Sequence, residues 1–146
     1  MERARGGPAK VTHRGYGAQV IFLDTNVFVY AVGRPHPLQD EARSFLAETL
    51  TEHLVTSCEV LQELLHIYLP VRRMETLDAA YRLVESRLDE VWPLESADVH
   101  QARLLADAHP TLNARDLVLL AVCQRRGVTN LKTFDRALSA VAAREL

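Results

Sequence analysis

Four carboxylic acids in this sequence sit where a negative charge is costly or where a predicted strand ends. They are Asp24, Glu63, Asp116 and Asp135, separated by 39, 53 and 19 residues. An unpaired carboxylate is expensive to bury, and four gathered together repel one another. A hard divalent cation offsets both penalties, because Mg²⁺ is usually held by one or two carboxylates, waters and a substrate phosphate. Such an ion activates a bound water and stabilises a leaving oxygen, which suits phosphodiester hydrolysis.

Asp24 and Asp135 each follow a run with the composition of a β-strand. Asp24 comes directly after residues 20–23, and Asp135 comes after residues 128–133. Open parallel sheets bind ligands at the carboxyl ends of their strands, so the two acids would share that edge. An Asp in this position also commonly caps the next helix. The two interpretations are balanced for Asp24, whereas Asp135 taken alone favours the cap.

Asp116 and Glu63 are distinguished by their positions on predicted helices. At about 100° per residue, Asp116 falls between Leu120 and Cys123 in an apolar stripe. Asp116 could simply complement the helix dipole from the first turn, but that role does not require its side chain to point toward the core. A ligand role is therefore favoured for Asp116. Glu63 lies on the border of the apolar arc of its helix and can reach a crevice. Glu59 lies on the polar side of the same helix and is expected to face water.

Alternating apolar runs and amphipathic segments predict strands that alternate with helices. The continuous run at 20–23 is typical of a strand covered on both faces. Gly33, Pro70 and Gly127 are expected to end helices, Ser57 to cap one, and Pro93 to mark an edge strand. Strands are predicted at 20–23, 54–56, 91–94 and 128–132, and helices at 27–32, 39–51, 58–68, 74–88, 96–108, from 114 or 116 to 126, and 134–141. This order predicts an α/β fold with a parallel sheet between helices.

The composition fits one ordinary globular domain. The chain has 146 residues, of which 48% are hydrophobic and 25% charged, so it can form one substantial core but not two. A net charge of −2 excludes a strongly basic protein that binds nucleic acid through phosphates alone. The longest apolar run, residues 117–123, is far shorter than the roughly 20 residues of a membrane span. Cys58 and Cys123 sit inside apolar stretches and lack metal-ligand spacing, so we expect buried, reduced thiols in a cytoplasmic protein.

The first 19 residues differ in composition from the remainder. They carry a formal charge of +3, against −5 for the rest, and contain four of the six glycines. They have no apolar core of a secretory signal, and their composition does not support folding. We therefore expect residues 1–19 to be a flexible basic extension and residues 20–146 to be the folded domain. A translation start near Val20 is favoured over an arm that contacts nucleic acid.

Taken in order, these residues resemble the PIN-domain ribonucleases and, by size, the VapC-type toxins of bacterial toxin–antitoxin pairs. The matching segments are residues 21–27 (IFLDTNV), Ser57-x-x-Val60-x-x-Glu63-Leu64, Ala114-Arg115-Asp116 and Thr133-Phe134-Asp135. The resemblance covers residues 20 to about 140. The opening strand with its Asp-Thr-Asn is the most specific part, and the ordered set of four acids is stronger than any one of them.

The resemblance implies a three-layer α/β/α PIN-like fold with a central, mainly parallel sheet. It also implies an endoribonuclease that depends on Mg²⁺ or Mn²⁺. The implied acidic pocket consists of Asp24, Glu63, Asp116 and Asp135. One ion would be held by Asp24 and Asp116, while the other two acids would position water or hold a second ion. Thr25 or Thr133 would supply an accessory hydroxyl, and Asn26 would orient Asp24.

VapC-type toxins are typically homodimers inhibited by a small cognate antitoxin, so the resemblance implies RNA, an antitoxin and a second copy as partners. Candidate phosphate contacts are Arg72-Arg73, Arg115 and Arg125-Arg126, although paired arginines late in a helix more often face solvent and complement the helix dipole. The main alternative is a catalytically silent PIN-like module that binds RNA or protein. Such a module would be expected to lose acids, whereas this sequence keeps all four.

Overall fold

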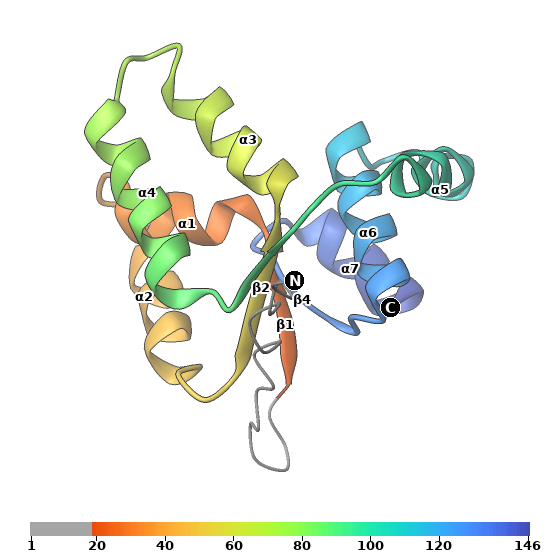
Figure 1. Ribbon diagram of the computed structural model, residues 1–146, viewed down its shortest axis with the longest axis horizontal. Coiled ribbons are helices and arrows are strands. Elements are labelled where there is room, and N and C mark those ends of the chain that lie inside the picture. The colour runs from red at the N-terminus through yellow and green to blue at the C-terminus, as the bar shows by residue number, and fades with distance from the viewer. Residues whose placement is uncertain (1–18) are drawn as a thin grey trace, which may run out of the picture.

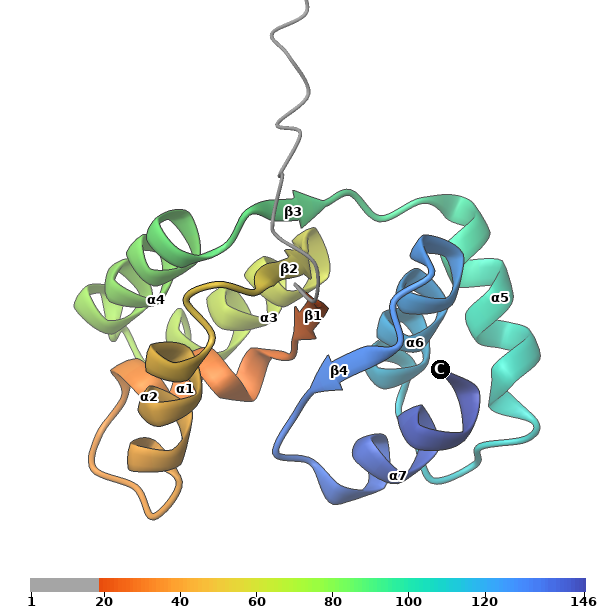
Figure 2. The ribbon, with the colours of Figure 1, turned by 90° about the horizontal axis from the view of Figure 1, so that it is seen from below.

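The central sheet of the computed structural model, which describes residues 19–146, contains four parallel strands in the order β3-β2-β1-β4. Helices α1–α4 lie on one side of this sheet and α5–α7 on the other, in two perpendicular views (Figure 1, Figure 2). The strands are β1 (Val20–Leu23), β2 (His53–Ser57), β3 (Glu90–Trp92) and β4 (Asn130–Lys132). The helices are α1 (Thr25–Val32), α2 (Gln39–Glu48), α3 (Cys58–Tyr68), α4 (Met74–Arg87), α5 (Ser96–Ala106), α6 (Ala114–Arg126) and α7 (Arg136–Glu145). The predicted three-layer α/β/α fold is confirmed.

Strand β1 is central because its side chains are apolar on both faces. Ile21, Phe22 and Leu23 are buried, and Phe22 pairs with Val55 of β2 and Leu131 of β4. A strand covered on both faces is expected to be continuously apolar, as this one is. The polar residues that follow β1 therefore emerge at the middle of the carboxyl edge of the sheet, next to the ends of both neighbouring strands.

Two hydrogen bonds align the carboxyl end of β1 with those of its neighbours β4 and β2. The backbone N–H of Asp24 donates to the carbonyl of Lys132 at 3.0 Å, which joins the end of β1 to the end of β4. The buried Thr56 hydroxyl donates to the carbonyl of Leu23 at 2.9 Å, which joins β2 to β1. The loops that leave these strands consequently begin at the same level.

The helix ends predicted from Gly33, Pro70 and Gly127 are confirmed. Helices α2 and α5 end before the predicted residues 51 and 108, and α7 extends beyond the predicted residue 141. Helix α6 begins after its cap Asn113 and ends at Gly127, whose φ of +68° is the left-handed conformation that favours glycine. Helix α3 ends at Tyr68, close before Pro70. Ser57 precedes α3 as expected, but it makes no side-chain capping bond. Strand β3 ends at Trp92, one residue before Pro93, and occupies the predicted edge position.

Residues 1–18 of the expected basic extension lie outside the described residues. In the part of the chain that is described, no helix is both long and apolar enough to cross a membrane. Apolar side chains such as Phe22 and Leu120 are fully buried against the two faces of the sheet. The expectation that both thiols are buried is confirmed for Cys123 and was wrong for Cys58, which is exposed at the start of α3.

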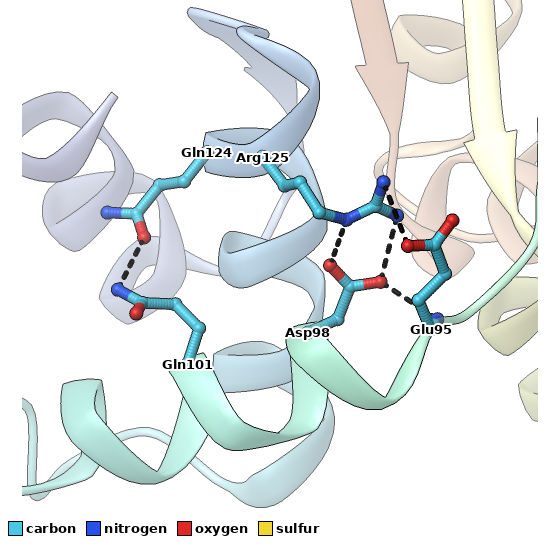
Figure 3. Close-up of polar contacts among 5 residues, drawn as sticks. All are labelled: Glu95, Asp98, Gln101, Gln124 and Arg125. Atoms are coloured by element: carbon cyan, nitrogen blue, oxygen red, sulfur yellow. Dashed lines mark hydrogen bonds and ion pairs between the residues drawn. The ribbon is translucent and has the colours of Figure 1, made fainter.

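A buried ion pair holds α5 against α6 (Figure 3). Asp98 is 1% exposed and accepts two hydrogen bonds from Arg125, from Nε at 2.6 Å and from Nη2 at 3.0 Å. Asp98 also accepts the backbone N–H of Glu95 at 3.0 Å, as part of a capping box at the start of α5. The hydrogen bond from Arg125 lowers the pKa of Asp98 below its ordinary value. This pair fixes the helix whose first turn carries Asp116.

We expect Asp98→Ala to lower the free energy of unfolding by about 2 kcal/mol, because it removes the hydrogen bonds that the buried carboxylate accepts from Arg125 and from the backbone of Glu95. The matched control is Asp107→Ala. Asp107 pairs with Arg103 four residues earlier on the protein surface, where both side chains are more than two-thirds exposed (71% and 81%). Such pairs contribute little to stability. Urea unfolding of both variants measures the difference, and equal losses would show that Arg125 regains its hydration without Asp98.

Candidate active site

A cavity of about 230 Å³ lies at the carboxyl edge of the sheet. Its walls come from the starts of α1, α3 and α6 and from the segment that follows β4. The polar lining consists of Asp24, Thr25, Asn26, Glu59, Glu63, Asn113, Arg115, Asp116 and Asp135. The fold therefore brings all four acids singled out from the sequence to one cavity, although 111 residues separate the first from the last.

Asp24 is both a helix cap and a wall of this cavity. Its Oδ1 accepts the backbone N–H of Thr25 at 2.7 Å, at the start of α1. Its Oδ2 accepts the Thr133 hydroxyl at 2.7 Å and the Asn26 amide at 3.3 Å. Burial raises the pKa of Asp24 above its ordinary value, and the hydrogen bonds from Thr133 and Thr25 oppose that rise. The sequence left open whether Asp24 caps a helix or lines a ligand site, and the structure shows that it does both.

Asn26 and Thr133 form a bridge between the residues after β1 and those after β4. The Asn26 amide donates to the Thr133 hydroxyl at 3.1 Å, and its carbonyl oxygen accepts the backbone N–H of Phe134 at 3.1 Å. The backbone N–H of Asp135 donates to the same Thr133 hydroxyl at 3.1 Å. Of the two candidate hydroxyls, that of Thr133 donates to Asp24, whereas Thr25 contributes its backbone N–H.

Asp116 lies in the first turn of α6, where its backbone N–H donates to the side chain of the cap Asn113 at 2.9 Å. The side chain is half-buried and lines the cavity. Burial raises the pKa of Asp116 to about 6, and the carboxylates of Asp24 and Asp135 contribute to the rise. Asp116 therefore belongs to a group of like charges that water does not fully screen.

Asp135 lies at the exposed rim of the cavity and caps α7. Its Oδ1 accepts the backbone N–H of Leu138 at 3.1 Å. Burial is the main cause of the raised pKa values of Asp24 and Asp116, and the nearby charge of Asp135 adds to both. The capping role expected for an isolated Asp is present, and it leaves the second carboxylate oxygen available at the cavity.

Glu63 forms an ion pair with Arg115 across the cavity. The Glu63 side chain is 13% exposed and that of Arg115 is 49% exposed, so the guanidinium is accessible from solvent. Glu63 therefore reaches the cavity as predicted, but its carboxylate is already paired with the Arg115 guanidinium.

The expectation that Glu59 faces water was wrong. Its side chain is half-buried and lines the cavity, and its Oε2 has no hydrogen-bond partner among residues 19–146. Burial raises the pKa of Glu59 to about 7, although the Arg115 guanidinium opposes the rise. The helical wheel located the core face of α3 alone. A helical wheel does not include neighbouring elements, so it could not show that the first turn of α3 also faces the start of α6.

Comparison with known proteins assigns the family. Residues 21–144 match the PIN domain. The chain is 58% identical over 122 residues to Ribonuclease VapC23 of Mycobacterium tuberculosis, an alignment that covers 82% of this chain and 96% of that protein. It is 39% identical over 119 residues to Ribonuclease VapC13 of the same organism, with 80% and 91% covered. The chain belongs to the VapC ribonuclease family of PIN-domain proteins.

Solved structures show that the fold of this PIN domain is that of VapC proteins. The crystal structure of VapC20 from Mycobacterium tuberculosis, described as a sarcin–ricin loop cleaving toxin, superposes with a TM-score of 0.73 at 21% identity and covers 83% of this chain and 94% of that one. VapBC2 from Rickettsia felis, bound to a DNA fragment from their promoter, gives a TM-score of 0.61 at 18% identity, with 80% and 88% covered. At these identities, the fold is what the structures share.

The acidic cavity of this PIN domain fits a divalent ion held by two protein carboxylates. In residues 19–146, no three His, Cys, Asp or Glu side chains are arranged to hold one ion together. Asp24 and Asp116 nevertheless share the cavity, influence each other's charge and form no ion pair with another described residue. Mg²⁺ is commonly bound by one or two carboxylates, with waters and phosphate oxygens as its other ligands. The residues present therefore suit such an ion and do not suit a closed cage of protein ligands.

Proposed function

We propose that this VapC-family chain is an endoribonuclease whose activity depends on Mg²⁺ or Mn²⁺ held by Asp24 and Asp116. The observation that carries the proposal is the convergence of these two half-buried carboxylates on one cavity, each with a pKa above its ordinary value. Such a pair is costly in the absence of a cation and well suited to its presence. When bound, the ion would supply an activated water and stabilise the leaving oxygen.

The other polar residues would arrange the substrate and the water. Thr133 and Asn26 hold Asp24 in place through the bonds described above. Asp135 is exposed and is the better candidate to accept a proton from the attacking water, because the carboxylate of Glu63 already faces a cation. Arg115 is accessible at the cavity and can contact an RNA phosphate, a charge-assisted interaction for which a guanidinium is well shaped. Glu63 would then position water, position Arg115, or help to hold a second ion.

Cleavage of RNA by the purified full chain tests metal dependence. We expect internal cuts in a structured RNA with Mg²⁺ or Mn²⁺, loss of cutting in EDTA, and recovery when either metal is added back. The products are read on a denaturing gel. Cutting that persists unchanged in EDTA would contradict the assigned role of the two carboxylates, and no cutting under any condition would favour a catalytically silent module.

We further propose that the chain is the toxin of a toxin–antitoxin pair, acts in the cytoplasm as a homodimer, and is inhibited by a small cognate antitoxin. Support comes from its VapC relatives and from the VapBC2 structure among its structural neighbours. Expression of the chain alone should arrest growth, and co-expression of the protein encoded next to it should restore growth. Harmless expression of a chain that cuts RNA in vitro would remove the toxin assignment and leave the nuclease assignment standing.

A further inference from the structure

Three aromatic rings adjoin the acidic cavity and have no role in the proposed chemistry. Tyr30 of α1 stacks on His36, with ring centroids 4.3 Å apart and an interplanar angle of 20°. Phe134, after β4, meets Tyr30 edge-on at 5.5 Å and 71°. Separations and angles of this kind are favourable for aromatic pairs. The three rings therefore form one ordered cluster, called here the aromatic platform.

The aromatic platform lies next to the acidic cavity. Tyr30 lines the same cavity as Asp24, Asn26 and Asp135. Phe134 immediately precedes Asp135, and its backbone N–H is fixed by the side chain of Asn26 at 3.1 Å. One ring of the platform therefore lines the cavity, and a second precedes the acid at its rim.

His36 is held in a defined orientation although it is exposed. Its Nδ1 accepts the backbone N–H of Leu38 at 3.0 Å, so in the neutral ring the proton is on Nε2. Pro35 and Pro37 flank it and restrict the backbone on both sides. The Gln39 side chain closes the loop, donating to the carbonyls of Tyr30 at 3.2 Å and Gly33 at 3.0 Å. An exposed ring that is already ordered loses little entropy when a partner binds it.

The negative charge of the chain and of its cavity means that an RNA substrate would need contacts other than phosphate attraction. The net charge is −2, and the cavity itself is acidic, so attraction of phosphates alone would be weak. Lys132 places its ammonium over Phe134 at 4.7 Å and over Phe45 at 5.1 Å, on the same side of the sheet edge. Unpaired RNA bases are commonly bound by stacking on aromatic rings, histidine included.

We propose that the aromatic platform binds one unpaired RNA base next to the cleaved bond, with the base stacked on His36 as a continuation of the His36–Tyr30 stack. The Nε2–H of His36 would be free to donate to the base or to the ribose. This inference rests on the proposed ribonuclease function. It adds that the substrate is single-stranded at the site of cleavage and that the enzyme grips a base there as well as phosphates.

The test uses full-length chain with Asp24→Asn, so that RNA is bound but not cut, and single-stranded RNAs with 2-aminopurine at successive positions. Stacking quenches 2-aminopurine fluorescence, and we expect quenching at one or two adjacent positions. His36→Ala should remove that quenching and weaken binding about fivefold or more, whereas His36→Phe should retain both. His100→Ala is the matched control, because His100 is an exposed histidine of α5, on the other side of the sheet.

Several results would overturn the platform. Quenching that is unchanged by His36→Ala would show that no base stacks there. A loss of binding in His36→Phe equal to that in His36→Ala, with a matching fall in unfolding temperature, would show that His36 only shapes its loop. Cleavage by the chain with native Asp24 is measured separately, so failure of the platform is distinguishable from failure of the ribonuclease proposal.

Discussion

Asp24→Asn should reduce RNA cleavage by at least about a hundredfold while leaving the protein folded. Asparagine is an equally good helix cap, so its oxygen can still accept the backbone N–H of Thr25 that starts α1. What the substitution removes is a negative charge that the proposed ion needs. It also removes a carboxylate whose pKa burial has raised, so the folded state loses an electrostatic cost. The cleavage rate under single-turnover conditions and the unfolding temperature measure the two effects.

The matched control for this experiment is Asp78→Asn, an exposed residue of α4, a helix that contributes no residue to the lining of the cavity. It should retain full cleavage. We expect the unfolding temperature of Asp24→Asn to stay within about 4 °C of the parent. If Asp24→Asn cuts RNA as fast as the parent preparation, the activity belongs to a contaminant and the catalytic assignment fails.

The metal-free protein should become less stable as the pH rises from about 4.5 to about 7. Burial raises the pKa of Glu59 to about 7 and that of Asp116 to about 6, above their values near 4 in an unfolded chain. In this window the folded protein binds more protons than the unfolded one, so its free energy of unfolding falls with increasing pH. The total change is on the order of a few kcal/mol. Below pH 4 the loss of the Asp98–Arg125 pair acts in the opposite direction, because the pKa of Asp98 is lowered.

Addition of Mg²⁺ or Mn²⁺ should offset this loss. The ion binds the ionised carboxylates of the folded state, so it should raise the unfolding temperature at pH 7.5 much more than at pH 5, where protons compete for the same oxygens. Thermal unfolding at both pH values, with EDTA or with metal, provides the four measurements. Glu59→Gln should flatten the pH profile, while Asp107→Asn on the surface should not. A metal-free protein that gains stability between pH 5 and pH 7 would contradict the described burial of these acids.

The fold could be predicted from local patterns because those patterns have direct physical causes. The uninterrupted apolar run of β1 requires cover on both faces, and Gly127 requires a helix to stop in the left-handed conformation. The positions of Asp24 and Asp135 at the sheet edge followed from strand direction alone. Side-chain partners between distant elements could not be predicted in this way. The ion pair of Asp98 with Arg125 and the ion pair of Glu63 with Arg115 depend on how α5, α3 and α6 are placed around the sheet.

Glu59 shows the same limit within the site. Its angle on the helical wheel was correct for α3 in isolation, but the wall opposite its first turn comes from α6, more than fifty residues later. The signal that could have identified it is its place two residues after the end of β2, at the edge already occupied by Asp24. Proximity to a strand end was, for this residue, a better guide than helical periodicity.

The bridge from Asn26 and Asp24 to Thr133 has a consequence for the order in which the enzyme is made. The Thr133 hydroxyl, which donates to Asp24 and accepts from Asn26, lies 109 and 107 positions after these two residues, directly after the last strand of the sheet. Domains fold as their sequence emerges during synthesis. The nascent chain therefore has no finished pocket until residues up to 135 have left the ribosome. A ribonuclease assembled in this way stays incomplete at its acidic pocket for nearly the whole time it is being translated.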